Sequence, residues 1–168
     1  MIERWLRPGT AAVLVMLASV GALAAAFTAQ YGFDLQPCIL CIYQRWPYGI
    51  AAALCLLALS PPGRRYPGPL LLLAAAALAV NAGIAGYHVG VEQHWWAGTD
   101  GCTGPGGTPA SLAELRAQIM ASPVVRCDQV AFSLFGISMA GYNVLSSALL
   151  SAYAGWAGWR GFTGNAAA

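Results

Sequence analysis

Residues 37–60 read PCILCIYQRWPYGIAAALCLLALS, so a pair of cysteines is joined directly to a long apolar run. A helix that crosses a bilayer needs roughly 20 predominantly apolar residues. The run that begins at Trp46 is shorter than this, so a spanning helix must also include Cys41 and Arg45. We therefore expect a membrane helix over residues 41–60, with a Cys-x-x-Cys at its start and Arg45 roughly 6 Å deeper along its axis.

Three further stretches, about 10–29, 69–89 and 132–154, are also long and apolar enough to span a bilayer. The composition agrees with this, because 58% of the residues are hydrophobic and 8% are charged, whereas an ordinary soluble domain is about 25% charged. We expect an all-α, integral membrane four-helix bundle that forms one domain over residues 1–168. The first stretch has the basic start of a signal peptide, but its apolar run exceeds the usual length of such segments, which favours a retained helix.

The arginines predict the orientation of the bundle, since cytoplasmic loops carry an excess of positive charge. Both termini are expected in the cytoplasm, and residues 90–131 are expected to form a long outer loop between the third and fourth helices. The arginines are too scattered for a nucleic-acid-binding surface. Those on the predicted cytoplasmic side are Arg4, Arg7, Arg64, Arg65 and Arg160.

The long loop contains a capping box, in which Ser111 precedes Glu114 by three residues. Apolar residues three or four positions apart then predict a short amphipathic helix over residues 111–120. This helix is expected either on the membrane surface or packed against the rest of the loop.

Four of the five cysteines lie on the predicted outer side, where an oxidising compartment lets disulfides persist. A bridge between Cys102 and Cys127 would stabilise the loop by roughly 3–4 kcal/mol, which is typical of a structural disulfide. A bridge within Cys38-x-x-Cys41 closes a short loop and suits thiol exchange better. The wide spacing of the loop pair disfavours zinc, so no metal is expected. Cys55 lies mid-span, where a buried thiol usually acts as a small hydrophobic residue.

The start of the second span favours a reactive thiolate. Pro37 suits the first position of a helix, which places Cys38 where free N–H groups and the helix dipole stabilise a thiolate. Arg45 shares a helical face with Cys41 and can donate hydrogen bonds to a carbonyl oxygen, so the pattern predicts electron transfer to a quinone. Arg45 can instead extend to the outer headgroups. His88 either relays a proton to the reduced quinone or is an ordinary interfacial residue.

The segment at residues 37–45 resembles the signature of the bacterial DsbB family, disulfide bond formation protein B. The resemblance extends to four spans, a separated cysteine pair in a long outer loop, and Phe-Gly-Ile-Ser-Met at residues 135–139. It implies an inner-membrane enzyme that reoxidises a periplasmic thioredoxin-like oxidase, DsbA, and reduces ubiquinone or menaquinone. By the family pattern the catalytic residues are Cys38, Cys41, Cys102 and Cys127, and the residues that contact the quinone are Arg45 and His88.

The same resemblance gives an electron path. The loop pair, with Cys102 facing the partner, accepts electrons from the oxidase and passes them to Cys38–Cys41, and Cys41 delivers them to the quinone. Gln44 stands where many members carry Glu, and we expect this difference to matter little.

Other interpretations of the cysteine pattern predict different chemistry. Relatives of vitamin K epoxide reductase also have four helices and four cysteines, but their Cys-x-x-Cys follows the other pair, whereas here it comes first. A non-catalytic membrane protein with two structural disulfides would leave Arg45 unexplained. A dithiol carrier would place reactive cysteines within two facing spans, and only Cys55 lies mid-span.

Overall fold

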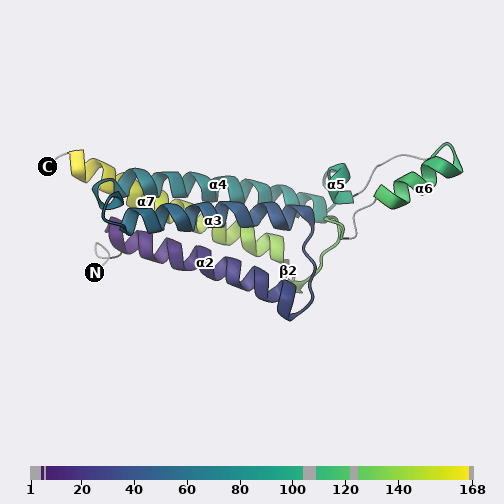
Figure 1. Cartoon of the computed structure of the whole chain (residues 1–168), viewed down its shortest axis with the longest axis horizontal. Helices are drawn as coiled ribbons and strands as arrows, with labels where there is room; N and C mark the ends of the chain where they lie inside the picture. The colour runs from purple at the N-terminus through teal and green to yellow at the C-terminus, as the bar shows by residue number, and fades with distance from the viewer. Residues whose placement is uncertain (1–4, 6, 104–108, 122–124, 167–168) are drawn as a thin grey trace.

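The computed structural model describes residues 5, 7–103, 109–121 and 125–166, and the statements below concern these residues. Four long helices lie side by side, and the shorter elements other than one connecting turn gather at one end (Figure 1). In chain order the elements are α2 (Pro8–Gly32), α3 (Ile39–Leu59), the 3-10 turn η1 (Gly63–Arg65), α4 (Pro67–Glu92), α5 (Asp100–Thr103), α6 (Leu112–Ala121), β1 (Ser133–Leu134), β2 (Ile137–Ser138) and α7 (Met139–Ala166).

The helices α2, α3 and α4 are each long and apolar enough to cross a membrane. Helix α7 is equally long, but it is not among them, because polar residues interrupt its apolar sequence. These polar side chains form hydrogen bonds to neighbouring helices, as polar residues in membrane helices commonly do. They are Asn143, Ser146, Ser147 and Ser151.

Small residues let the long helices approach closely. The core of the bundle is rich in buried alanines from all four long helices, together with Val15, Leu71 and Leu78. Where α4 begins against the far end of α7, a Cβ on Gly158 would lie 3.0 Å from the carbonyl oxygen of Gly68. Such close contact between backbones is the usual role of glycine in membrane helix packing.

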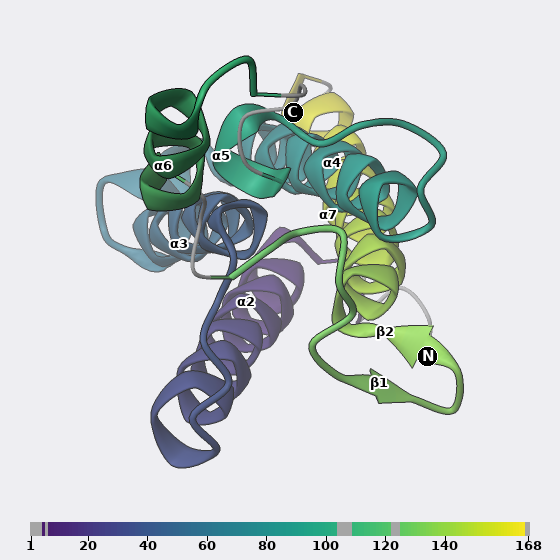
Figure 2. The ribbon, with the colours of Figure 1, turned by 90° about the vertical axis from the view of Figure 1, so that its right-hand side faces the viewer.

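The all-α expectation is confirmed except for one hairpin, and there the expected boundary of the fourth span is wrong. The span was expected from residue 132, but β1 and β2 pair antiparallel, with Leu134 opposite Ile137. Phe135 and Gly136 have φ of 51° and 78°, as a two-residue hairpin turn requires. Helix α7 therefore begins at Met139, and the hairpin lies beside the N-terminal end of this helix (Figure 2).

The amphipathic helix expected in the loop is present as α6. Glu114 N–H donates to Ser111 Oγ, which is the first half of the predicted capping box. The Glu114 carboxylate accepts from the N–H of Ala110, one residue before the Ser111 N–H that a capping box uses. Of the two expected positions, packing against the rest of the loop is not seen among the described residues, because α6 projects beyond the bundle (Figure 1). Leu112 and Met120 are 82% and 80% exposed.

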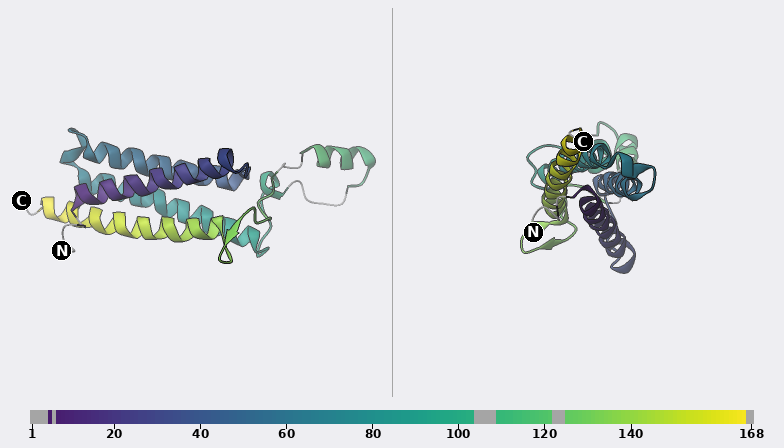
Figure 3. Two further views of the ribbon diagram at one scale, coloured as in Figure 1. Left: turned by 90° about the horizontal axis from the view of Figure 1, so that it is seen from below. Right: turned by 90° about the vertical axis from the view of Figure 1, so that its left-hand side faces the viewer.

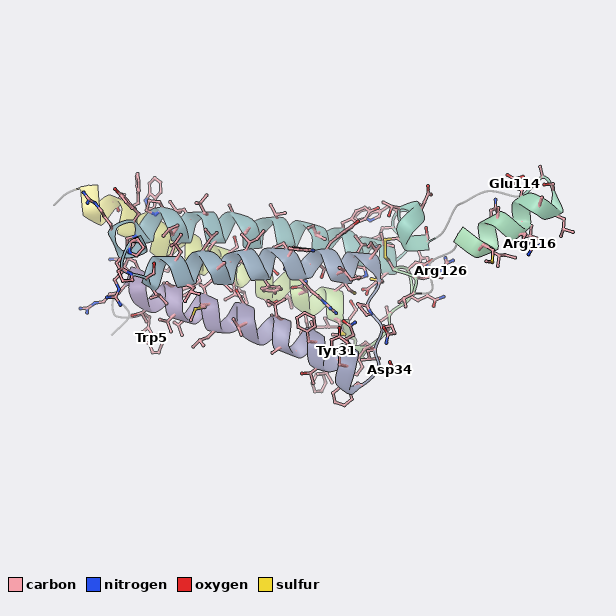
Figure 4. All side chains as sticks on the ribbon, in the orientation of Figure 1. Trp5, Tyr31, Asp34, Glu114, Arg116 and Arg126 are labelled. Carbon is pink, nitrogen blue, oxygen red and sulfur yellow. A yellow bond between two sulfur atoms is a disulfide. The ribbon has the colours of Figure 1, made fainter. Side chains whose placement is uncertain are left out.

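The two ends of the bundle differ in charge. Both termini and η1, which carries Arg64 and Arg65, lie at one end (Figure 3). At the opposite end lie Asp34 and Arg126, while Glu114 and Arg116 lie farther out on α6 (Figure 4). Of the arginines used to predict orientation, Arg4 lies outside the described residues.

Candidate functional site

The two cysteines at the start of α3 face each other as free thiols. Cys38 is the N-cap of the helix, and its Sγ accepts a hydrogen bond from the backbone N–H of Cys41 at 3.4 Å. The two Sγ atoms lie 3.1 Å apart. Pro37 was expected at the first position of the helix, but it precedes the cap, and Cys38 takes the N-cap position instead. From this position the side chain of Cys38 can accept a hydrogen bond from a free N–H group of the first turn. Cys38 is buried and Cys41 is half-buried.

His88 approaches the pair from the last turn of α4. Its Nε2 lies 3.6 Å from Cys38 Sγ and 3.8 Å from Glu92 Oε1. The hydrogen bond with Cys41, and after it the one with His88, holds the pKa of Cys38 well below its usual value, although burial opposes this. Ser138, just before α7, donates to the other oxygen of Glu92. These contacts favour a thiolate at Cys38.

The loop cysteines form a disulfide, Cys102–Cys127, with Cα atoms 5.0 Å apart. Both are fully buried, and they pack in one apolar cluster with Cys38, Leu40 and Val91. The backbone N–H of Cys127 also donates to the carbonyl of Cys102. The sequence placed both cysteine pairs on the same side of the membrane, but the packing of the loop disulfide against Cys38 is seen only in the fold.

A cavity of about 360 Å³ opens beside Cys41. It lies between α2, α3 and α7, and alanines of α2 supply much of its apolar wall. Arg45 lines it too: the guanidinium donates to Gln30 Oε1 at 2.6 Å and lies 4.8 Å from the ring centroid of Phe27. Arg45 Nε is buried and has no hydrogen-bond partner among the described residues. His88, which was expected to contact the quinone, is not one of the residues that line this cavity. Its imidazole contacts the thiol of Cys38.

Gln44, which stands where many members of the resembled family carry Glu, is part of the site. It is buried, its Nε2 lies 3.0 Å from His88 Nδ1, and its Oε1 accepts from Asn143. Sequence reasoning also missed Asn143 and Tyr48, whose hydroxyl donates to Asn143 Oδ1 at 2.6 Å. The available signal was an amide residue within an otherwise apolar span, since polar residues in membrane helices usually have partners or functions.

The ligand atoms of Cys38, Cys41 and His88 lie within 4.8 Å of one another. Closed structural zinc sites use four ligands, and no fourth ligand among the described residues joins this group. The arrangement of two adjacent thiols beside an imidazole suits thiol–disulfide exchange, in which a stabilised thiolate attacks or leaves.

A model of the family described as disulfide bond formation protein DsbB matches residues 8–157 of this chain. An uncharacterised protein of Rickettsia prowazekii is 28% identical over 145 residues, which cover 85% of this chain and 83% of that protein. A disulfide bond formation protein B of Xanthomonas campestris pv. campestris is 42% identical over 85 residues, and one of Herminiimonas arsenicoxydans is 35% identical over 80. These two alignments each cover 48% of this chain, and 48% and 50% of the respective relatives, about half of each. No solved structure matches the chain.

Proposed function

The chain belongs to the DsbB family of disulfide bond formation proteins, and from this premise we propose that it is a thiol:quinone oxidoreductase of a bacterial inner membrane. Its partner would be a periplasmic thioredoxin-like dithiol oxidase of the DsbA kind, and its acceptor ubiquinone or menaquinone. The observation that carries this proposal is that Cys41 and Arg45 line one apolar cavity at the start of α3.

The residues of the cavity suit a quinone ring. Ligand pockets generally begin at roughly 300 Å³ and are mostly apolar with a few polar groups, and this cavity of about 360 Å³ follows that pattern. The unpartnered Nε of Arg45 is a donor for a carbonyl oxygen. When bound there, a quinone supplies a lipid-soluble acceptor of two electrons and two protons.

The cysteines carry the exchange steps. A thiolate of the partner attacks the Cys102–Cys127 disulfide, forming a mixed disulfide with Cys102 and releasing Cys127. The partner's second thiol resolves that bond, so the partner leaves oxidised and the loop pair holds both electrons. The loop dithiol then reduces a Cys38–Cys41 disulfide by the same exchange, and oxidation of this pair through Cys41 delivers two electrons and two protons to the acceptor.

The buried packing of both pairs in one cluster supports their direct exchange. The orientation follows from charge, because the end with η1 and both termini carries Arg64 and Arg65 and would face the cytoplasm. The four long helices would then form the membrane bundle, with residues 90–131 as the periplasmic loop. The partner-facing loop pair would lie in the oxidising compartment.

The test is quinone reduction by the purified protein in detergent. A reduced thioredoxin-like dithiol and a soluble ubiquinone analogue are supplied, and the quinone absorbance is followed. Catalytic loss of quinone that depends on both the protein and the dithiol is expected. The rival assignment, a membrane protein with two structural disulfides, predicts no quinone loss beyond the protein-free control.

Cys55 is expected to take no part in electron transfer. Its side chain is fully buried in the core of the bundle, packed among apolar residues of the long helices. Cys55→Ala should leave quinone turnover unchanged and lower stability by about 1 kcal/mol, because only one buried sulfur is removed. Turnover and thermal unfolding of the variant check both parts, and an inactive but folded variant would place Cys55 in the electron path.

A further inference from the structure

A line of hydrogen bonds leads from the interior of the bundle to the thiol of Cys38. It passes through three helices: Tyr48 and Gln44 on α3, Asn143 on α7, and His88 on α4. Three of these four side chains are at most 6% exposed. Unpaired polar groups in such a place are costly, so the direction of each bond is constrained by its neighbours.

The imidazole of His88 fixes the direction of the hydrogen bonds at the end of the line that meets Cys38. His88 Nε2 faces two acceptors, the sulfur of Cys38 and the carboxylate of Glu92, and both favour a proton on Nε2. A neutral imidazole protonated at Nε2 has an unprotonated Nδ1, which accepts. Gln44 must then turn its Nε2 amide group toward Nδ1, which leaves its Oε1 as the acceptor on the opposite side.

The amide of Asn143 completes the same pattern. Its Nδ2 donates to Gln44 Oε1, so its Oδ1 faces the other way. That oxygen accepts from the hydroxyl of Tyr48 at 2.6 Å, and it also accepts from Asn81 at 3.3 Å and Ser147 at 3.1 Å. Three donors converge on one oxygen, and this convergence holds the amide of Asn143 in a single orientation.

We propose that Asn143, anchored by Tyr48, is a positioning residue that fixes the tautomer of His88 through Gln44, so that Nε2–H is always directed at Cys38. Every bond in the line then donates toward the thiol. The imidazole is prepared to stabilise the Cys38 thiolate whenever exchange releases it, without first exchanging its proton. This role rests on the proposed function, because it concerns the same cysteine pair.

The titratable groups that face His88 do not oppose the assignment of its proton to Nε2. From α3 the titratable neighbours are Cys38, Cys41 and the phenol of Tyr48, and from α4 there is the carboxylate of Glu92. The loop disulfide that packs against Cys38 does not titrate. Helix α7 contributes the neutral amide of Asn143.

The direct test reads the two ring nitrogens of His88. The chain has two histidines, and replacing the exposed His94 by Asn, which tolerates its positive φ, leaves one imidazole. Nitrogen NMR of ¹⁵N-histidine-labelled, reduced, quinone-free protein at about pH 8 should show an unprotonated Nδ1 and a protonated Nε2. A protonated Nδ1 in this otherwise native protein overturns the proposal without any further variant.

The variant Asn143→Asp replaces the donor toward Gln44 by an acceptor of the same shape. Gln44 should turn over to donate to the new carboxylate, and its Oε1 should then draw a proton onto Nδ1, moving the Nδ1 resonance upfield. Ser151→Ala is the matched control, since it removes another contact between α7 and α4, from Ser151 Oγ to the carbonyl of Ala75, and should keep the native spectrum.

An unchanged Nδ1 resonance in folded Asn143→Asp protein would also overturn the proposal. The NMR measurement of the His88 nitrogens is independent of catalytic turnover. A native tautomer as expected together with no quinone reduction would reject the proposed function alone, and the reverse result would reject only the positioning role.

Discussion

Cys41→Ser is expected to abolish catalytic quinone reduction while the protein still oxidises one equivalent of its dithiol partner. The loop disulfide Cys102–Cys127 is preformed and does not require Cys41 to accept one pair of electrons. Without Cys41, however, Cys38 cannot form its disulfide, so the electrons have no route to the cavity. The loss should exceed roughly a thousandfold, as for removal of a covalent nucleophile.

Two measurements on the same sample separate these steps. Quinone absorbance reports turnover, and mass spectrometry of alkylated protein reports how many thiols the partner has reduced in the variant. Cys55→Ala is the matched control because it removes another thiol of α3 that lies away from the cavity. Continued quinone reduction by Cys41→Ser would mean that electrons leave the protein from a different sulfur.

The helices α2, α3 and α4 could be predicted because each is a long apolar run, and bilayer thickness sets the length required. The start of the fourth could not, since residues 132–138 are mostly apolar and only the backbone shows that Phe135 and Gly136 turn. Local hydrophobicity does not distinguish a short hairpin from the first turns of a helix. The capping box before α6 was readable because it is a local interaction.

Only the part of the site that depends on residues close together in the sequence could be predicted. Cys38, Cys41 and Arg45 lie within about two turns at the start of one helix, so their proximity followed from helix geometry. The contact of His88 with Cys38, and of Gln44 with Asn143, joins residues from different helices. These depend on how the helices rotate about their axes, which hydrophobic periodicity does not fix when nearly every face of a helix is apolar.

Arg45→Ala is expected to raise the KM for quinone and lower kcat/KM by roughly 10- to 150-fold, while the partner still reduces the loop disulfide. The reason is the loss of a charge-assisted hydrogen bond, worth roughly 1.5–3 kcal/mol, to an oxygen that gains negative charge as electrons arrive. Arg45→Lys should recover part of this loss, because the charge remains but the planar fork that bonds Gln30 and stacks on Phe27 is gone.

The control must separate quinone binding from the general cost of removing a stacked arginine. Arg65 serves this purpose, since its guanidinium lies 5.9 Å from the ring of Tyr66 at the opposite end of the bundle. Arg65→Ala should keep the native KM. Steady-state kinetics at varied quinone decide the matter: an Arg45→Ala enzyme with native KM and kcat would show that Arg45 only packs α3 against α2. In that event the acceptor must be held by other residues of the cavity, with Tyr48 and Asn143 the next to replace.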